Sequence, residues 1–192
     1  MCIAQKRIEK TMLDASITAI QIDANSCFQV LLRTVVSDEI SIEAQMDGEY
    51  SNDLDLTVAE QGNTLLISAG FRPEFKNPND KLSAHKVVSI ALNISIPEWK
   101  NVTLFGTNTR VIVDGNYTKL HISLADGSCE LNNIAKITTV KTQSGNIIVH
   151  EKAAQIRAES KYGSVSNNPI PKGLNEYQLN TVTGNIRLNK TE

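Results

Sequence analysis

The 192-residue chain has few aromatic residues, few cysteines and no large excess of charge. Aromatic residues make up 5% of it, with a single tryptophan, Trp99, so no stacking platform for sugars is evident. The formal net charge is −2, and no dense run of lysine or arginine occurs. This composition gives no electrostatic reason to expect nucleic acid as a partner.

The three cysteines, Cys2, Cys27 and Cys129, are too few and too scattered for a disulfide framework. No CxxC motif and no His/Cys cluster with zinc spacing occurs, so we expect unpaired or buried thiols and no cofactor or metal. No apolar run approaches the roughly 18–20 residues that span a bilayer, so we expect no transmembrane segment.

The amino terminus reads MCIAQKRIEK and leaves two interpretations open. Cys2 and Ala4 are small residues at the two positions that a signal peptidase reads, but no basic or apolar segment precedes them. Residues 1–10 are either the remnant of an export signal or a disordered start. If Met1–Ala4 is the remnant of a cleaved signal, the protein is extracytoplasmic (periplasm or cell surface), and otherwise it is cytoplasmic.

The carboxy-terminal half contains a repeat centred on small residues. Thr109, Gly127, Gly145, Gly163 and Gly184 are separated by 18, 18, 18 and 21 residues. On each side of these positions, residues two apart alternate inward, which is strand periodicity. The expected inward positions are Val102, Leu104, Val111, Val113, Leu120, Ile122, Cys129, Leu131, Thr138, Val140, Ile147, Val149, Ile156, Ala158, Val165, Asn167, Tyr177, Leu179, Ile186 and Leu188.

A fixed period near 18 with two strands per unit is typical of a β-solenoid. We expect coils stacked at roughly 4.8 Å, with glycines at a corner where positive φ is cheapest. An antiparallel meander is a weaker alternative because it does not require a constant period. The longer last interval leaves room for NNPIPKGLNEY, which we interpret as a protruding turn.

The amino-terminal half is also rich in strand signals. Alternating segments divided by turn residues predict strands over 17–23, 28–34, 39–47, 54–60, 64–70 and 86–97. Phe71–His85 contains two prolines and no period, so we expect a long surface loop there. The predicted fold is an all-β, single-stranded parallel β-solenoid or β-helix with coils of about 18 residues. Within one domain, 11–192, repeat coils (101–192) follow a meander or sandwich-like part (11–100).

Several stretches carry a family resemblance: ISIPEWKNVTLFGTNTRVIVDG, LADGSCEL, TQSGNIIV, SKYGSV and TVTGNIRL, with QIDANSCFQVLL and NTLLISA. From about Ile17 onward the chain resembles the bacterial "putative adhesin" domains of unknown function, β-solenoid proteins of the Bacteroidetes type that are similar to autotransporter adhesin heads. The resemblance implies export and a structural or adhesion role in the cell envelope. The family has no agreed catalytic residues to carry over.

An enzyme that acts on polysaccharides from a β-helix scaffold is an alternative. Glycoside hydrolysis needs two carboxylates roughly 5–9.5 Å apart. Glu130 and Glu159 are candidates, with Asp126 and Glu151 near turns, but none recurs on adjacent units. We interpret these carboxylates as solvated and predict no enzyme. Placement of Glu130 and Glu159 on separate faces would weaken the enzyme hypothesis further.

The predicted register also defines a flat polar face on four neighbouring strands. Its residues are His121, Ser123, Thr139, Lys141, Arg157, Glu159, Gln178 and Asn180. Such a face fits docking of a surface glycan or protein, and it equally fits a plain solvated surface. We therefore predict a non-enzymatic adhesion-type module of the envelope. A cytoplasmic, self-associating scaffold remains a further alternative, and the sequence does not determine the oligomeric state.

Overall fold

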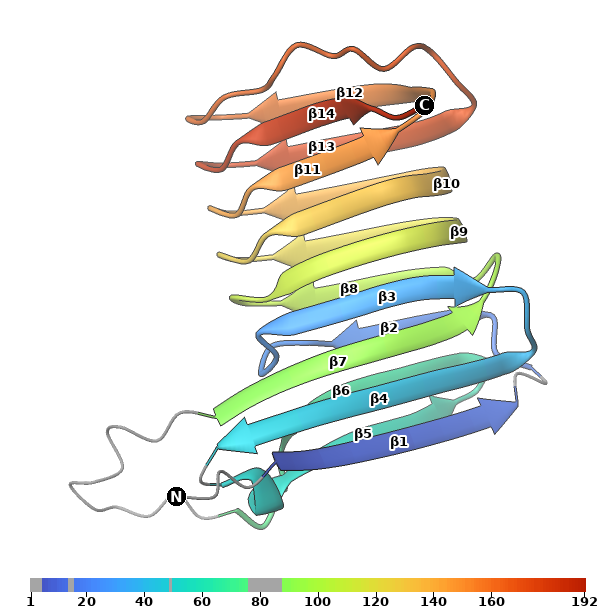
Figure 1. The fold of residues 1–192 in the computed structure, drawn as a ribbon, viewed down its shortest axis with the longest axis vertical. Coiled ribbons are helices and arrows are strands. Elements are labelled where there is room, and N and C mark those ends of the chain that lie inside the picture. The colour runs from blue at the N-terminus through green and yellow to red at the C-terminus, as the bar shows by residue number, and fades with distance from the viewer. Residues whose placement is uncertain (1–4, 14–15, 49, 76–87) are drawn as a thin grey trace.

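The computed structural model describes residues 5–13, 16–48, 50–75 and 88–192, and the regular secondary structure of these residues is almost entirely β-strand (Figure 1). A 3-10 turn, η1, spans Ser51–Asp53. The strands are β1 Gln5–Leu13, β2 Ala19–Asp23, β3 Gln29–Val35, β4 Glu39–Gly48, β5 Leu54–Gln61, β6 Thr64–Phe71, β7 Val88–Pro97, β8 Asn101–Gly106, β9 Arg110–Leu124, β10 Cys129–Thr142, β11 Ile147–Glu151, β12 Ala154–Ser160, β13 Asn175–Thr181 and β14 Ile186–Lys190.

The strands form one mixed 14-stranded sheet that folds back on itself into a nearly closed, barrel-like body (Figure 1). One side, the β3 wall, has the order β1-β4-β7-β3-β9-β10-β11-β14. The other side, the β8 wall, has the order β5-β6-β2-β8-β9-β10-β13-β12. β9 and β10 belong to both walls because their 15 and 14 residues are long enough to pass around the corner between them.

The predicted single-stranded parallel β-solenoid was wrong, although the all-β class is confirmed. Three strand pairs are antiparallel: β1 with β4, β4 with β7, and β5 with β6. The strands also do not stack in chain order. β3 lies between β7 and β9, and β13 lies between β10 and β12.

The position of β13 has a physical explanation. Tyr177 of β13 pairs with Thr138 on one side and with Ile156 on the other. All three residues have the same phase in the inward alternation, so any of them can occupy the next level of the wall. The sequence period therefore determines the register of the strands without determining their order.

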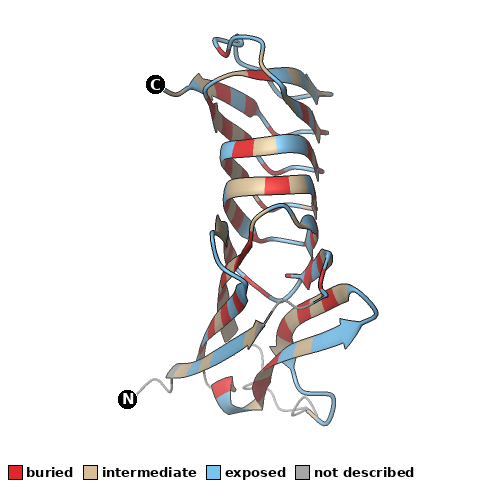
Figure 2. Cartoon of the chain, turned by 90° about the vertical axis from the view of Figure 1, so that its right-hand side faces the viewer, coloured by how far each residue is buried: buried red, intermediate tan, exposed pale blue. Residues whose placement is uncertain are grey.

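The two walls enclose one apolar core. Buried and exposed positions alternate along the strands, as Figure 2 shows. The predicted inward residues are buried or packed against the core, with two exceptions. Val165 is 40% exposed and Asn167 is also exposed, because the chain leaves the wall after Ser160 and pairs again only at an isolated bridge between Val165 and Ile186. Cys129 is a buried free thiol, as expected.

The glycine column, which consists of Gly127, Gly145 and Gly184 of the repeat, allows close backbone approach and does not provide positive φ. A Cβ at Gly127 would collide with the Thr109 carbonyl, one at Gly145 with the Gly127 carbonyl, and one at Gly184 with the Gly145 carbonyl. None of these glycines has positive φ, so the corner conformation expected from the sequence was wrong. Adjacent levels need glycine because their backbones are in direct contact.

A strap formed by residues 161–174 covers the upper end. It crosses the top of the molecule between β12 and β13 (Figure 1), so the protruding turn expected there was wrong. Ile170 is buried, and the Ala154 N–H donates to the Pro171 carbonyl at 2.9 Å. The strap thereby covers part of the free edge of β12, which would otherwise be open to another strand.

Lysines of β1 join the two walls at the lower end. Lys6 Nζ donates to the Leu54 carbonyl at 2.5 Å, and Lys10 Nζ donates to the Leu56 carbonyl at 2.7 Å. Part of the segment 1–10 is thus a paired strand. In the predicted surface loop, Phe71 ends β6 and stacks on Phe75, and the rest of that loop, 76–87, lies outside the described residues. Within the described residues, no helix is long and apolar enough to cross a membrane.

Candidate binding face and hollow on the β8 wall

Strand register brings the eight predicted polar residues together in two rows on the β8 wall. The first row is His121, Thr139, Gln178 and Arg157, and the second is Ser123, Lys141, Asn180 and Glu159. The order within each row differs from the sequence order because β13 lies between β10 and β12. Alternation along each strand turns these side chains away from the core.

The side chains of this polar face are available for contact. Lys141, Arg157, Glu159 and Gln178 are exposed, and the other four are half-buried. Within the described part of the chain, none of the eight side chains makes a hydrogen bond or an ion pair. Burial, with a smaller contribution from the charge of Lys141, lowers the pKa of His121. His121 is therefore disfavoured as a cation at its place in the first row.

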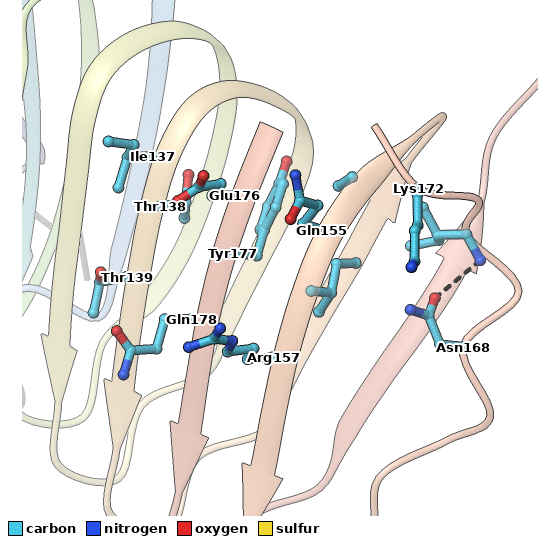
Figure 3. A pocket seen from close by; sticks show the side chains of 13 residues that line it. Ile137, Thr138, Thr139, Gln155, Arg157, Asn168, Lys172, Glu176, Tyr177 and Gln178 are labelled. Carbon is cyan, nitrogen blue, oxygen red and sulfur yellow. Dashed lines mark hydrogen bonds between the residues drawn. The ribbon is translucent and has the colours of Figure 1, made fainter. Parts of the chain in front are cut away.

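A hollow of about 450 Å³ lies where the polar face meets the strap (Figure 3). Three of the predicted residues, Thr139, Arg157 and Gln178, line it. Sequence reasoning missed the rest of the lining, which consists of Ile137, Thr138, Ala154, Gln155, Ile156, Asn168, Ile170, Lys172, Glu176 and Tyr177. The strap side could not be inferred because nothing in its sequence shows that it folds back over β12.

Two amides of the hollow are held in place by single hydrogen bonds. Asn168 Oδ1 accepts from the Ile170 N–H at 2.9 Å, and Gln155 Nε2 donates to the Gly173 carbonyl at 3.4 Å. The amide nitrogen of Asn168 and the amide oxygen of Gln155 remain without protein partners in the described structure. The hollow thus presents an oriented donor and an oriented acceptor.

The candidate carboxylates of the enzyme hypothesis are not brought together. Glu130 lies on the β3 wall, 3.6 Å from Arg110 and 3.7 Å from His150, whereas Glu159 lies on the β8 wall. Asp126 accepts a hydrogen bond from Ser144. No group of three potential metal ligands occurs among the described residues.

Glu151, the last residue of β11, has a structural role. It is buried, and the hydroxyl of Tyr177 lies 2.6 Å from its Oε2. The same hydroxyl accepts from the Ile134 N–H at 3.0 Å. Burial and the hydrogen bond to Glu151 raise the pKa of Tyr177, so the phenol stays protonated and donates.

A smaller hollow of about 170 Å³ lies near the lower end. Asp23, Asn25, Phe71 and Arg72 line it together with Asp55, whose Oδ2 lies 4.0 Å from Arg72 Nε. None of these residues was singled out from the sequence. Asp23 Oδ1 already accepts hydrogen bonds from both the backbone and the side chain of Asn25.

Comparison with known proteins found similarity in structure only. No known family and no curated protein matches the chain in sequence. A solved structure named as a "putative cell adhesion protein" from Clostridium sporogenes ATCC 15579 is similar over 97% of this chain and 100% of its own, with 15% identity and a TM-score of 0.63. This similarity establishes a shared fold.

Two further solved structures are named "putative adhesin". The one from Bacteroides fragilis NCTC 9343 is 12% identical, with coverage of 95% and 96% and a TM-score of 0.39. The one from Parabacteroides distasonis ATCC 8503 is 10% identical, with coverage of 95% and 97% and a TM-score of 0.42.

Proposed function

We propose that the protein is a non-enzymatic, adhesion-type module that binds a surface glycan or protein outside the cytoplasm through the polar face of the β8 wall. The observation that carries the proposal is the set of eight outward side chains, all without partners in the described structure, that run into the hollow beside the strap. The names of the similar solved structures support the same class of function.

The face suits recognition of a repetitive chain. Successive residues of a row are one strand apart, roughly 4.8 Å, so each row offers regularly spaced hydrogen-bonding groups. The strands hold these groups at fixed positions, which reduces the conformational entropy lost on binding. Each polar contact contributes little binding free energy by itself. Useful affinity therefore needs several contacts along a row, together with the concave hollow at its end.

The polysaccharide-acting enzyme gains no support from the site. Its two best carboxylates, Glu130 and Glu159, project from opposite walls, and a single glycosidic bond cannot lie between them. The export interpretation rests on Met1–Ala4, and these residues lie outside the described part of the chain. Export from the cytoplasm therefore remains a proposal.

The test is binding of the purified 192-residue protein to immobilised glycans and matrix proteins, followed by titration of each hit. The double variant Gln178→Ala/Asn180→Ala removes one amide from each row, and we expect it to weaken saturable binding tenfold or more. The control is Arg187→Ala, on the β3 wall. Absence of any saturable ligand, or equal binding by the double variant and the wild type, would overturn the proposal.

A further inference from the structure

We propose that the hollow binds the acidic sugar of a glycan, a pyranose that carries a carboxylate. This inference rests on the proposed function and assigns a ligand class to one end of the binding face. At about 450 Å³, the hollow falls within the range of roughly 300–1,000 Å³ common to small-molecule sites. It is concave, whereas the remainder of the face is a flat sheet surface.

The charge of the lining selects an anion. Arg157 and Lys172 are its cations and Glu176 its anion, so the lining has a formal charge of +1 in a chain with a net charge of −2. Arg157 and Lys172 are exposed, and neither forms an ion pair in the described structure. Their charge is therefore available to a ligand.

The two cations reach the hollow from different elements. Arg157 projects from β12 beside Gln178 of β13, while Lys172 and Asn168 belong to the strap, as Figure 3 shows. The planar Arg157 fork can donate two N–H groups to a carboxylate, and Lys172 adds a second positive charge to the lining. Glu176 of β13 pairs with Ile137 of β10 on one side and with Gln155 of β12 on the other. It therefore lies two residues along the strands from the pair formed by Gln178 and Arg157.

The other lining groups match the rest of a pyranose. The amides of Gln155, Gln178 and Asn168 both donate and accept, as sugar hydroxyls do. Ile137 is 44% exposed and offers an apolar surface to the C–H face of the ring. Acidic side chains of a protein partner also carry carboxylates, but they lack the ring hydroxyls that the three amides of the lining would bind. The lining thus favours an acidic sugar over an acidic peptide.

The experiment compares two matched pairs of probes by isothermal titration calorimetry at low salt. The acidic probes are a galacturonic acid tetrasaccharide and a glucuronic acid-containing tetrasaccharide, and each is paired with its methyl ester, which has nearly the same shape without the charge. We expect at least one acid to bind tenfold or more tightly than its ester. Its affinity should fall as salt concentration rises.

Variants locate the binding. Arg157→Gln and Lys172→Gln each remove one exposed cation, and we expect each to weaken binding of the acid tenfold or more while leaving binding of the ester unchanged. Arg187→Gln, on the β3 wall, removes a similar charge elsewhere and should change affinity less than twofold. An acidic peptide, such as tetraglutamate, should bind more weakly than the acidic sugar.

The outcomes separate this inference from the proposed function. Failure of both acids to bind, equal binding of acid and ester, or undiminished binding by Arg157→Gln would overturn the acidic-sugar site. If a neutral glycan or a protein still binds and Gln178→Ala/Asn180→Ala abolishes that binding, the adhesion module stands without the acidic ligand. If no ligand of any class binds, both proposals are wrong.

Discussion

The upper region of the molecule, residues 101–192, and the lower region, the described residues of 5–97, use the same inward alternation but connect their strands differently. Every strand pair within the upper region is parallel, and Gly127, Gly145 and Gly184 let successive levels touch. All the antiparallel pairs lie in the lower region. There, Gly62 has φ +62° in the turn between β5 and β6.

The difference shows which properties of the chain determine core and topology. Inward alternation gives both regions a continuous core, whichever direction the strands run. Between β5 and β6 the connection decides direction, because a tight turn with positive φ joins antiparallel strands, whereas parallel neighbours require a longer return path. A charge placed in the core should therefore lower the free energy of unfolding equally in both regions. Substitution of a glycine should lower it by an amount that depends on the region.

The largest expected effect tests the shared core. Val140 and Ile42 are fully buried, one in each region, and an aspartate at either position would place an unpaired charge in the core. We expect Val140→Asp and Ile42→Asp each to cost about 4 kcal/mol in the free energy of unfolding. Lys141→Asp, one residue along on the exposed face, should cost less than about 0.5 kcal/mol.

Urea unfolding followed by circular dichroism measures these three variants. If the aspartate variants do not fold, Val140→Ala should still cost about 2 kcal/mol by loss of buried volume, and Lys141→Ala should cost almost nothing. Equal losses at positions 140 and 141 would show that the inward and outward assignment in β10 is wrong.

A smaller effect separates the two regions. An alanine at Gly145 would press its Cβ into the Gly127 carbonyl and force two levels apart, at a cost of about 3 kcal/mol. An alanine at Gly62 meets nothing within 4 Å, so only its positive φ matters, and we expect a cost of about 1 kcal/mol. Thermal and urea unfolding of both variants provide the comparison. A loss from Gly62→Ala as large as that from Gly145→Ala would refute backbone contact as the role of the glycine column.

The same contrast explains what could be predicted from the sequence. Strands such as β4 and β6 lie within one residue of their expected bounds, because alternation and flanking turn residues are local signals. The order of β12 and β13 was not predictable, since Ile156 and Tyr177 have equivalent inward positions. β1 was missed because its inward side carries Lys6 and Lys10, which bind carbonyls of β5 and hide the apolar alternation.

The candidate site was predictable to a similar extent. Outward residues such as Thr139 and Gln178 follow from strand period alone, and register places them side by side. The hollow depends on the strap, which contacts β12 through the hydrogen bond from the Ala154 N–H to the Pro171 carbonyl. Pro171 lies in a segment without strand alternation. No local pattern encodes such a contact, so Asn168 and Lys172 were not foreseen as part of the site.

The smallest expected effect is a pH dependence that belongs to the upper region. His121 lies on the polar face, while the described part of the lower region contains no histidine. Burial, assisted by Lys141, lowers the pKa of His121 in the folded protein. As the pH falls below the unfolded value of about 6.5, the unfolded chain takes up a proton more readily than the folded one, so folding loses stability.

The contribution of His121 is therefore fully present above about pH 6.5 and is lost as the pH falls through the folded pKa. Urea unfolding at pH 7.5 and pH 5.5 measures the total change, to which carboxylates also contribute. His121→Gln removes only the histidine contribution and should make the loss of stability on acidification smaller than in the wild type. Because His121 is only half-buried, the difference should be modest. An equal or larger loss in His121→Gln would mean that the position does not disfavour the imidazolium, and the electrostatic description of the first row would have to be revised.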